Sequence, residues 1–193
     1  MYKLLRALAL MMAAMLVVFM IGCGSPLQRP TSEQTDLVAL FKEEGVVVVV
    51  PWQGKEVKVK KLPPFFEELP KQEEQQQQDP IFSAKREVIN FEVVDANTEE
   101  MLTKFEPPIK LYVVYTNEDI QSAGGVENLR LAFWDNVDER WVVFTDKKHQ
   151  FEMRDKDSWP VNEFFELPDD AAGFGFASVP NWDDLPIAWG KPE

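Results

Sequence analysis

The sequence predicts a mainly β protein whose body, residues 37–193, is an antiparallel β-sandwich. Short runs of β-branched and aromatic residues recur about every ten residues from residue 46 onward, and turn-forming residues separate them. This spacing is typical of antiparallel sandwiches and barrels. No long amphipathic helix interrupts the runs, which argues against a parallel α/β sheet.

The first 22 residues have the composition of a secretory signal peptide. Lys3 and Arg6 form a short positive region, residues 7–21 are uncharged and apolar, and small residues follow at 22–25. The apolar run is shorter than the about 20 residues that a membrane-spanning helix needs. We therefore expect residues 1–22 to form a signal helix that is removed on export.

The junction Met20-Ile21-Gly22-Cys23 resembles the lipobox of bacterial lipoproteins. Gly22 and Cys23 match the small residue and the cysteine of that motif, whereas Met20 stands where Leu is usual. The resemblance implies cleavage between Gly22 and Cys23 and acylation of Cys23, with palmitate among the chains. The mature protein would then be anchored to a membrane of the cell envelope, on its extracytoplasmic side. A plain cleaved signal, an uncleaved anchor and a buried helix are the alternative interpretations.

The next segments lead from the anchor into the fold. Residues 23–36 are polar, contain two prolines and show no apolar period, which predicts a lipidated, flexible tether. Residues 37–44 favour one or two helical turns that end at Gly45. The five valines at 46–50 predict a strand that is buried on both faces.

Residues 55–62 predict a second strand, because two valines alternate there with charged residues. We expect this strand to form a hairpin with residues 46–50 that turns near Gly54. Its lysines would hinder edge-to-edge pairing. Residues 63–80 contain four prolines and five glutamines, which predicts a long low-complexity excursion.

From residue 87 onward, alternation of apolar and polar residues predicts most of the remaining strands. The clearest candidates are residues 87–95, 109–115, 129–134 and 141–144. Weaker candidates are residues 149–153, 164–167, 174–179 and 187–189. Residues 116–125 predict a connection with a helical turn.

Part of this region resembles the immunoglobulin-like and ZU5-like modules of bacterial surface proteins. Residues 105–116 show the pattern Phe-x-Pro-Pro-Ile-x-Leu-x-Val-x-Tyr-Thr, and Leu-x-Leu-x-Phe-Trp-Asp at 129–135 precedes Arg140-Trp141-Val142. The resemblance covers residues 105–146 and implies an immunoglobulin-like sandwich that serves as a spacer or binding module. It transfers no catalytic residues.

The charge balance narrows the range of partners. Lys3 and Arg6 lie in the leader, so the remainder carries 33 acidic side chains against 18 basic ones. This field repels phosphate backbones, so nucleic acid is not an expected partner. The acidity either keeps an exported domain soluble or includes carboxylates that bind Ca²⁺ or a cationic partner. Cys23 is the only cysteine, so the chain has no internal disulfide.

Motifs for catalysis or metal binding are scarce. His149 is the only histidine and no Gly-x-Ser-x-Gly motif occurs, so we predict no catalytic residue and no cofactor. The weak metal candidates are carboxylates in two turns: Asp135, Asp138, Asp155 and Asp157. They lack the spacing of a Ca²⁺ loop, which favours solvated turns.

Aromatic residues are the remaining candidates for binding. Trp134 and Trp141 flank one predicted hairpin. They could line a groove that binds sugars or peptides, or they could be buried in a second hydrophobic layer. We favour burial. Phe65 and Phe66 are expected to pin the 63–80 excursion to the core.

Three functions are consistent with these features. The first is a non-catalytic envelope lipoprotein, attached to the membrane through its lipid, whose sandwich binds an envelope protein or a glycan or has a structural role. The second is an extracytoplasmic hydrolase, directed at glycans, that uses acidic residues. The third is a module that binds Ca²⁺ or another solute.

Overall fold

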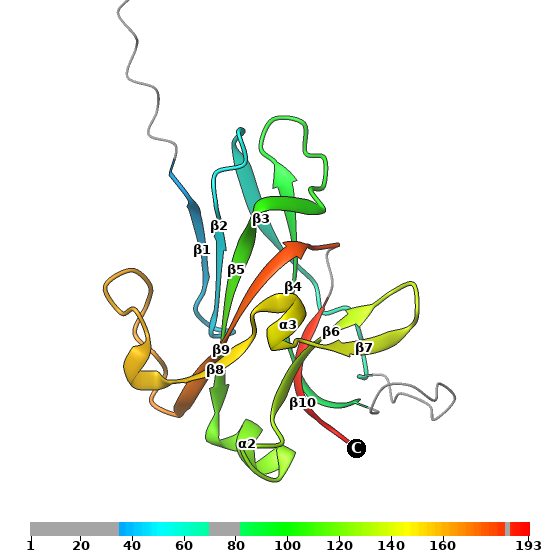
Figure 1. The fold of residues 1–193 in the computed structure, drawn as a ribbon, viewed down its shortest axis with the longest axis vertical. Coiled ribbons are helices and arrows are strands. Elements are labelled where there is room, and N and C mark those ends of the chain that lie inside the picture. The colour runs from blue at the N-terminus through cyan, green and yellow to red at the C-terminus, as the bar shows by residue number, and fades with distance from the viewer. Residues whose placement is uncertain (1–34, 70–81, 184–185) are drawn as a thin grey trace, which may run out of the picture. The chain divides into compact units, whose positions relative to one another are not determined.

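The computed structural model describes residues 35–69, 82–183 and 186–193, and in these ranges the protein is a β-sandwich (Figure 1). Two five-stranded antiparallel sheets pack against each other. The first sheet has the order β1 (Leu37–Phe41), β2 (Val46–Val50), β5 (Lys104–Thr116), β9 (Ala171–Asn181), β8 (Glu152–Asp155). The second sheet has the order β3 (Val57–Leu62), β4 (Phe82–Asp95), β10 (Ile187–Pro192), β6 (Arg130–Asp135), β7 (Arg140–Val143). The predicted fold class is confirmed.

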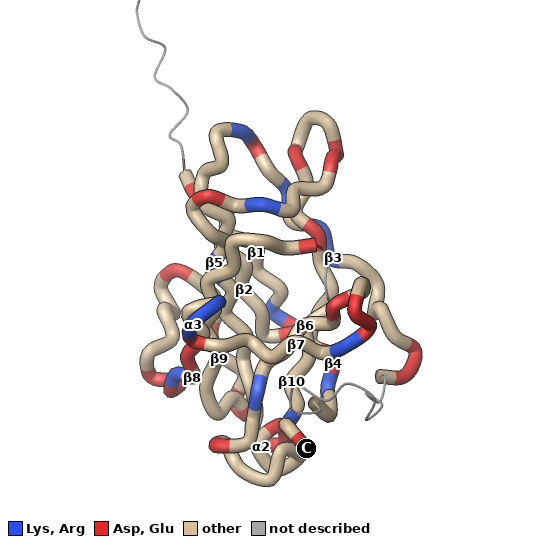
Figure 2. The backbone as a smooth tube through the Cα atoms, turned by 45° about the vertical axis from the view of Figure 1, so that its right-hand side comes forward, with Lys and Arg blue, Asp and Glu red and all other residues tan. Residues whose placement is uncertain are grey.

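Three short helical segments lie in the connections between strands. They are α2 (Asn117–Ala123), α3 (Asp146–His149) and the 3-10 turn η1 (Lys156–Ser158). The helical turn expected within residues 116–125 is therefore present as α2. Figure 2 shows that Asp and Glu gather at the turns and connections of the domain.

The main hydrophobic core lies between the two sheets. Val46, Val48 and Val50 point into it from β2, and Trp182 stacks on Phe91 there with ring centroids 4.6 Å apart. The Trp182 indole N–H also donates to the Phe91 carbonyl at 3.1 Å, so its one polar atom is satisfied inside the core.

The outer face of each sheet is also partly covered. Val47 and Val49 point away from the main core and pack in a second cluster with Trp159 and Phe165. This cluster explains why every valine of β2 is buried, as the sequence predicts. On the other sheet, Phe66 packs over Trp134 and Trp141, while its neighbour Phe65 is 47% exposed.

The helix expected at residues 37–44 is wrong, because residues 37–41 form the strand β1. Leu37 pairs with Val50 and Phe41 with Val46, and a turn that ends at Gly45 joins the two strands. Leu and Ala are good helix formers, but such preferences are worth less than about 1 kcal/mol per residue, and pairing along β2 outweighs them. The alternating exposure of β1 fits a strand with one face on the core.

The hairpin expected between residues 46–50 and 55–62 is also wrong. β2 pairs with β1 and β5 in the first sheet, whereas β3 pairs with β4 in the second. The segment between β2 and β3 therefore crosses from one sheet to the other. Turn residues between two strands predict a reversal of the chain, but they do not fix which strand becomes the neighbour.

Several weaker expectations are decided by the structure as well. Residues 164–167 form no strand and instead help to cover the first sheet, where Phe164, Phe165 and Leu167 pack in its outer cluster. His149 ends α3, and the strand predicted at 149–153 begins only at Glu152. Residues 187–189 lie in β10, which is the central strand of its sheet. The leader, Cys23 and most of the 63–80 excursion lie outside the described residues.

Candidate functional site

Asp119, a buried residue of α2, forms an ion pair with Arg86 of β4. Helix α2 lies at one end of the sandwich (Figure 1). The Asp119 carboxylate accepts hydrogen bonds from Arg86 Nε at 2.9 Å and from Arg86 Nη2 at 2.8 Å. It also accepts from the Thr116 backbone N–H at 2.8 Å and from the Thr116 hydroxyl at 3.1 Å. Thr116 in turn caps the helix by accepting from the Asp119 N–H at 3.2 Å. This capping box fixes Asp119 in place, and Asp119 fixes Arg86.

The pair joins the two sheets. Arg86 belongs to β4 of the second sheet, and its Nη2 also lies 3.4 Å from the Val114 carbonyl of β5 in the first sheet. The Trp189 indole N–H of β10 donates to the same carbonyl at 2.9 Å. Burial raises the pKa of Asp119, but the hydrogen bonds and charge of Arg86 and the bonds from Thr116 outweigh it and leave the pKa lowered. Asp119 is therefore held ionised.

A cleft of about 520 Å³ opens above this pair. Its walls come from the β1–β2 turn, the start of β4, α2 and the segment before β9. Its charged lining residues are Glu43, Glu44, Lys85, Arg86, Glu118, Asp119 and Asp170. Carboxylates outnumber cations in the cleft, so it suits a cationic group better than an anion.

A second cleft of about 530 Å³ lies beside the β6–β7 turn and contains His149. Asp135 and Asp138 line it together with Asp183, while Phe133 and Val179 form part of its apolar wall. Two of the four carboxylates singled out from the sequence therefore share a cleft with the only histidine. The other two, Asp155 and Asp157, do not line it.

The His149 ring is fixed by its surroundings. Its Nδ1 accepts from the Thr145 backbone N–H at 3.2 Å, and its ring lies 5.1 Å from Phe144 and 5.8 Å from Phe133, both edge to face. Burial, and then the charge of Lys148, lower the pKa of His149. An acceptor role for Nδ1 requires the neutral ring, so geometry and electrostatics favour the same state.

Two of the four candidate aspartates make contacts within a turn through their side chains. Asp135 Oδ1 accepts from the backbone N–H groups of Val137 at 2.9 Å and Asp138 at 3.2 Å. Asp138 forms an ion pair with Arg140 at 3.2 Å. Asp155 and Asp157 are exposed around η1. Within residues 35–69, 82–183 and 186–193, no group of three or more His, Cys, Asp or Glu side chains is arranged to hold a metal ion.

Trp134 and Trp141 lie on the outer face of the second sheet. They are 8% and 4% exposed, and their rings meet edge to face at 5.4 Å. Phe66 covers both, with its ring centroid 5.2 Å from Trp134 and 5.9 Å from Trp141. The two indoles therefore stabilise the base of the 63–80 excursion and present little open surface to a ligand.

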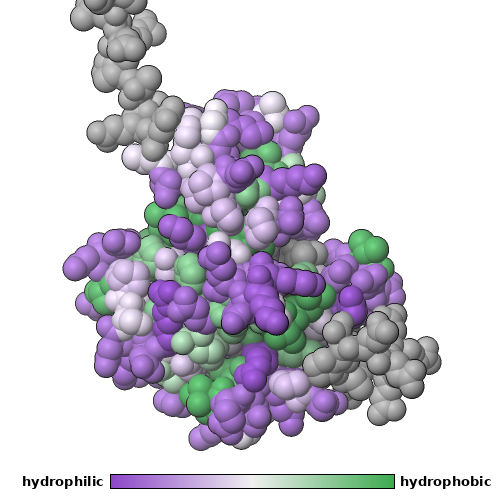
Figure 3. Space-filling model, viewed as in Figure 1, coloured by the Kyte–Doolittle hydropathy of each residue, from purple (hydrophilic) through white to green (hydrophobic). Residues whose placement is uncertain are grey.

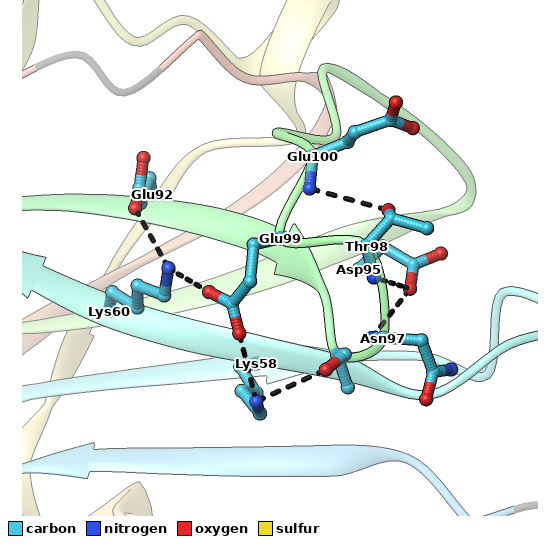
Figure 4. A network of polar contacts seen from close by, with 9 residues as sticks. Lys58, Lys60, Glu92, Asp95, Asn97, Thr98, Glu99 and Glu100 are labelled. Carbon is cyan, nitrogen blue, oxygen red and sulfur yellow. Dashed lines mark hydrogen bonds and ion pairs between the residues drawn. The ribbon is translucent and has the colours of Figure 1, made fainter.

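A third polar cluster connects β3 with the turn after β4 (Figure 4). Lys58 donates to Glu99 at 3.0 Å and to the Ala96 carbonyl at 3.1 Å, and Lys60 pairs with Glu99 and Glu92. Hydrogen bonds from Lys60 and then Lys58 lower the pKa of Glu99. Because these charged groups are paired but largely exposed, the cluster adds modestly to the stability of the edge strand β3.

The sequence contains one sign of the Arg86–Asp119 site, which is a helix-capping pattern at residues 116–119. Thr116-Asn117-Glu118-Asp119 matches the capping-box pattern and marks Asp119 as the residue that bonds back to its own helix start. Arg86 has no comparable sign, because its partner is 33 residues away and meets it only through the packing of the sheets.

No protein-family model, curated protein or solved structure matches this chain. None of the helices within the described ranges is long and apolar enough to cross a membrane.

Proposed function

We propose that this chain is an extracytoplasmic lipoprotein, anchored to a membrane of the cell envelope through Cys23, whose β-sandwich is a non-catalytic binding or structural module. One observation carries the proposal. A leader that ends in Gly22-Cys23 and a polar tether stand directly before a domain that encloses its own core. Such an order separates the anchor from the folded body.

The fold is consistent with a folded domain that is separate from the tether. Both sheets and all three hydrophobic clusters lie within residues 37–193. We therefore expect the sandwich to fold without the leader, so that cleavage before Cys23 leaves it intact.

The chemistry of the clefts gives the glycan hydrolase less support. Such an enzyme needs one carboxyl group whose pKa is raised, so that it can donate a proton. The buried carboxylate of the cleft beside α2, Asp119, has a lowered pKa and is paired with Arg86. This arrangement suits a structural role and favours the non-catalytic interpretation.

Metabolic labelling with an alkyne fatty acid tests the proposal. The full chain, expressed in a bacterium that matures lipoproteins, should take up label and lose residues 1–22 by mass. Cys23→Ser should take up none, whereas the neighbouring Ser25→Ala should label as the wild type does. Equal labelling of Cys23→Ser, or a full-length chain that keeps Met1 in the cytosol, would contradict the proposal.

A further inference from the structure

The four edge strands of the sandwich differ in how they are protected. β3 carries three lysines, β7 begins with Arg140, and β8 contains Glu152 and Arg154. Charges of this kind hinder pairing between the free edges of two molecules. β1 has the sequence Leu-Val-Ala-Leu-Phe and carries no charge.

β1 is also held in an extended conformation that suits pairing. It pairs along its full length with β2, and Leu37, Ala39 and Phe41 pack against the main core. The alternate residues Val38 and Leu40 are 42% and 41% exposed. Among the described strands, β2 is its only neighbour, so its second edge is unpaired within residues 35–69, 82–183 and 186–193.

We propose that β1 pairs antiparallel with β1 of a second copy of this chain, which would join the two first sheets into one continuous sheet. The pair would be centred on Ala39, so that Ala39 lies opposite its own counterpart. Val38 would then lie opposite the partner's Leu40, and Leu37 opposite the partner's Phe41. An isologous contact of this kind requires a self-complementary strand, and β1 is apolar at each of these positions.

Charge complementarity selects this register. Residues 36 and 42 flank β1, and centring on Ala39 places Asp36 opposite the partner's Lys42 at both ends of the pair. A shift that moved Asp36 by two residues would place it opposite Leu40 or Glu44 of the partner, which loses the ion pair or sets two carboxylates together. A shift by one residue would set core-facing side chains against outward-facing ones.

Disulfide trapping tests the register. The two copies of Ala39 would lie about 4.5–5.5 Å apart at Cα, which is within the range of a disulfide. In a chain of residues 24–193, which lacks Cys23 but contains both sheets and all three clusters, Ala39→Cys should oxidise to a dimer. Leu40→Cys is the matched control, because its two copies would be offset along the strands beyond about 7 Å. We expect at least about tenfold faster crosslinking for Ala39→Cys, and equal rates would overturn the proposal.

A charge swap tests the ion pairs separately. In the Ala39→Cys background, Asp36→Lys or Lys42→Asp alone should slow crosslinking by roughly fivefold, because each sets like charges opposite each other. The double change should restore the rate. Asp36 also accepts the Trp52 backbone N–H at 3.2 Å, and this bond is lost both in Asp36→Lys and in the double change, so restoration relative to Asp36→Lys isolates the contact between copies.

Failure of the double change to restore crosslinking would overturn the register. A shorter chain, residues 35–193, tests whether the segment before residue 35 covers the free edge of β1. Crosslinking that occurs in the shorter chain but is absent from residues 24–193 would show that the chain before residue 35 covers β1, and this result also refutes pairing between copies.

Discussion

Replacement of Asp119 by alanine should destabilise the sandwich by an amount that the structure allows us to work out. The change removes the two hydrogen bonds that Thr116 donates to the Asp119 carboxylate, from its backbone N–H and its hydroxyl, which cost about 1 kcal/mol. It also removes two charged hydrogen bonds from Arg86, which cost roughly 2 kcal/mol because the Arg86 side chain is 37% exposed and can take up water. We expect a loss of about 3 kcal/mol in the free energy of unfolding, or about 6–12 °C in Tm for a domain of this size.

Urea unfolding followed by tryptophan fluorescence measures this loss directly. Glu118→Gln is the matched control, because Glu118 precedes Asp119 in α2 and lines the same cleft but is exposed. The control should change the free energy of unfolding by less than about 0.5 kcal/mol. If Asp119→Ala costs no more than this control, the network does not join the sheets as we describe.

The same site makes a prediction about pH. The pKa of Asp119 is lower in the folded chain than in the unfolded one, so the unfolded state takes up the proton first. The stabilisation is therefore complete above about pH 4, the ordinary pKa range of aspartate, and is lost as the pH falls through the folded value. The difference in stability between the wild type and Asp119→Asn should shrink below that pH, and a constant difference would contradict the assignment.

Three further predictions concern other parts of the fold. Gly45→Ala should cost about 2 kcal/mol more in urea unfolding than Gly54→Ala, since both have positive φ but only at Gly45 would a Cβ meet Val114, at 2.9 Å; equal costs would refute the close contact. The pKa of His149, measured by NMR, should lie below about 6.5, the ordinary value for histidine. The free energy of unfolding of the wild type, relative to that of His149→Gln, should therefore fall as the pH decreases below about 6.5. A measured pKa at or above about 6.5 would show that the ring is not held neutral. Phe66→Ala should cost about 1–2 kcal/mol and make tryptophan fluorescence more accessible to acrylamide; a fluorescence response no larger than that of Phe65→Ala would show that Phe66 does not cover Trp134 and Trp141.

Figure 3 shows a largely hydrophilic surface with scattered apolar patches. Isolated apolar side chains on such a surface are ordinary, and Val137, at 90% exposed, stands alone on the β6–β7 turn. β1 differs because its exposed side chains accompany an open strand edge. This difference makes the edge of β1 a more specific candidate for contact than the exposed turns.

Local patterns in the sequence were sufficient for the elements that depend on local chemistry. The valine run at 46–50, the alternation in 129–134 and the turn that becomes α2 each appear as expected. Leu129 and Leu131 point into the core, as their spacing predicts, because side chains alternate across a strand whatever its neighbours are.

Pairing between distant segments decided the rest. Residues 37–41 become a strand because β2 offers them an edge, and β3 leaves β2 because β4 is its partner in the other sheet. Arg86 and Asp119 meet for the same reason, although 33 residues separate them. The sequence by itself determined the leader pattern, the class of fold and the positions of most strands, since composition and alternation are local properties. Only the tertiary structure decided strand order, the buried ion pair and the unprotected edge, because these depend on which surfaces come together when the chain buries its apolar side chains.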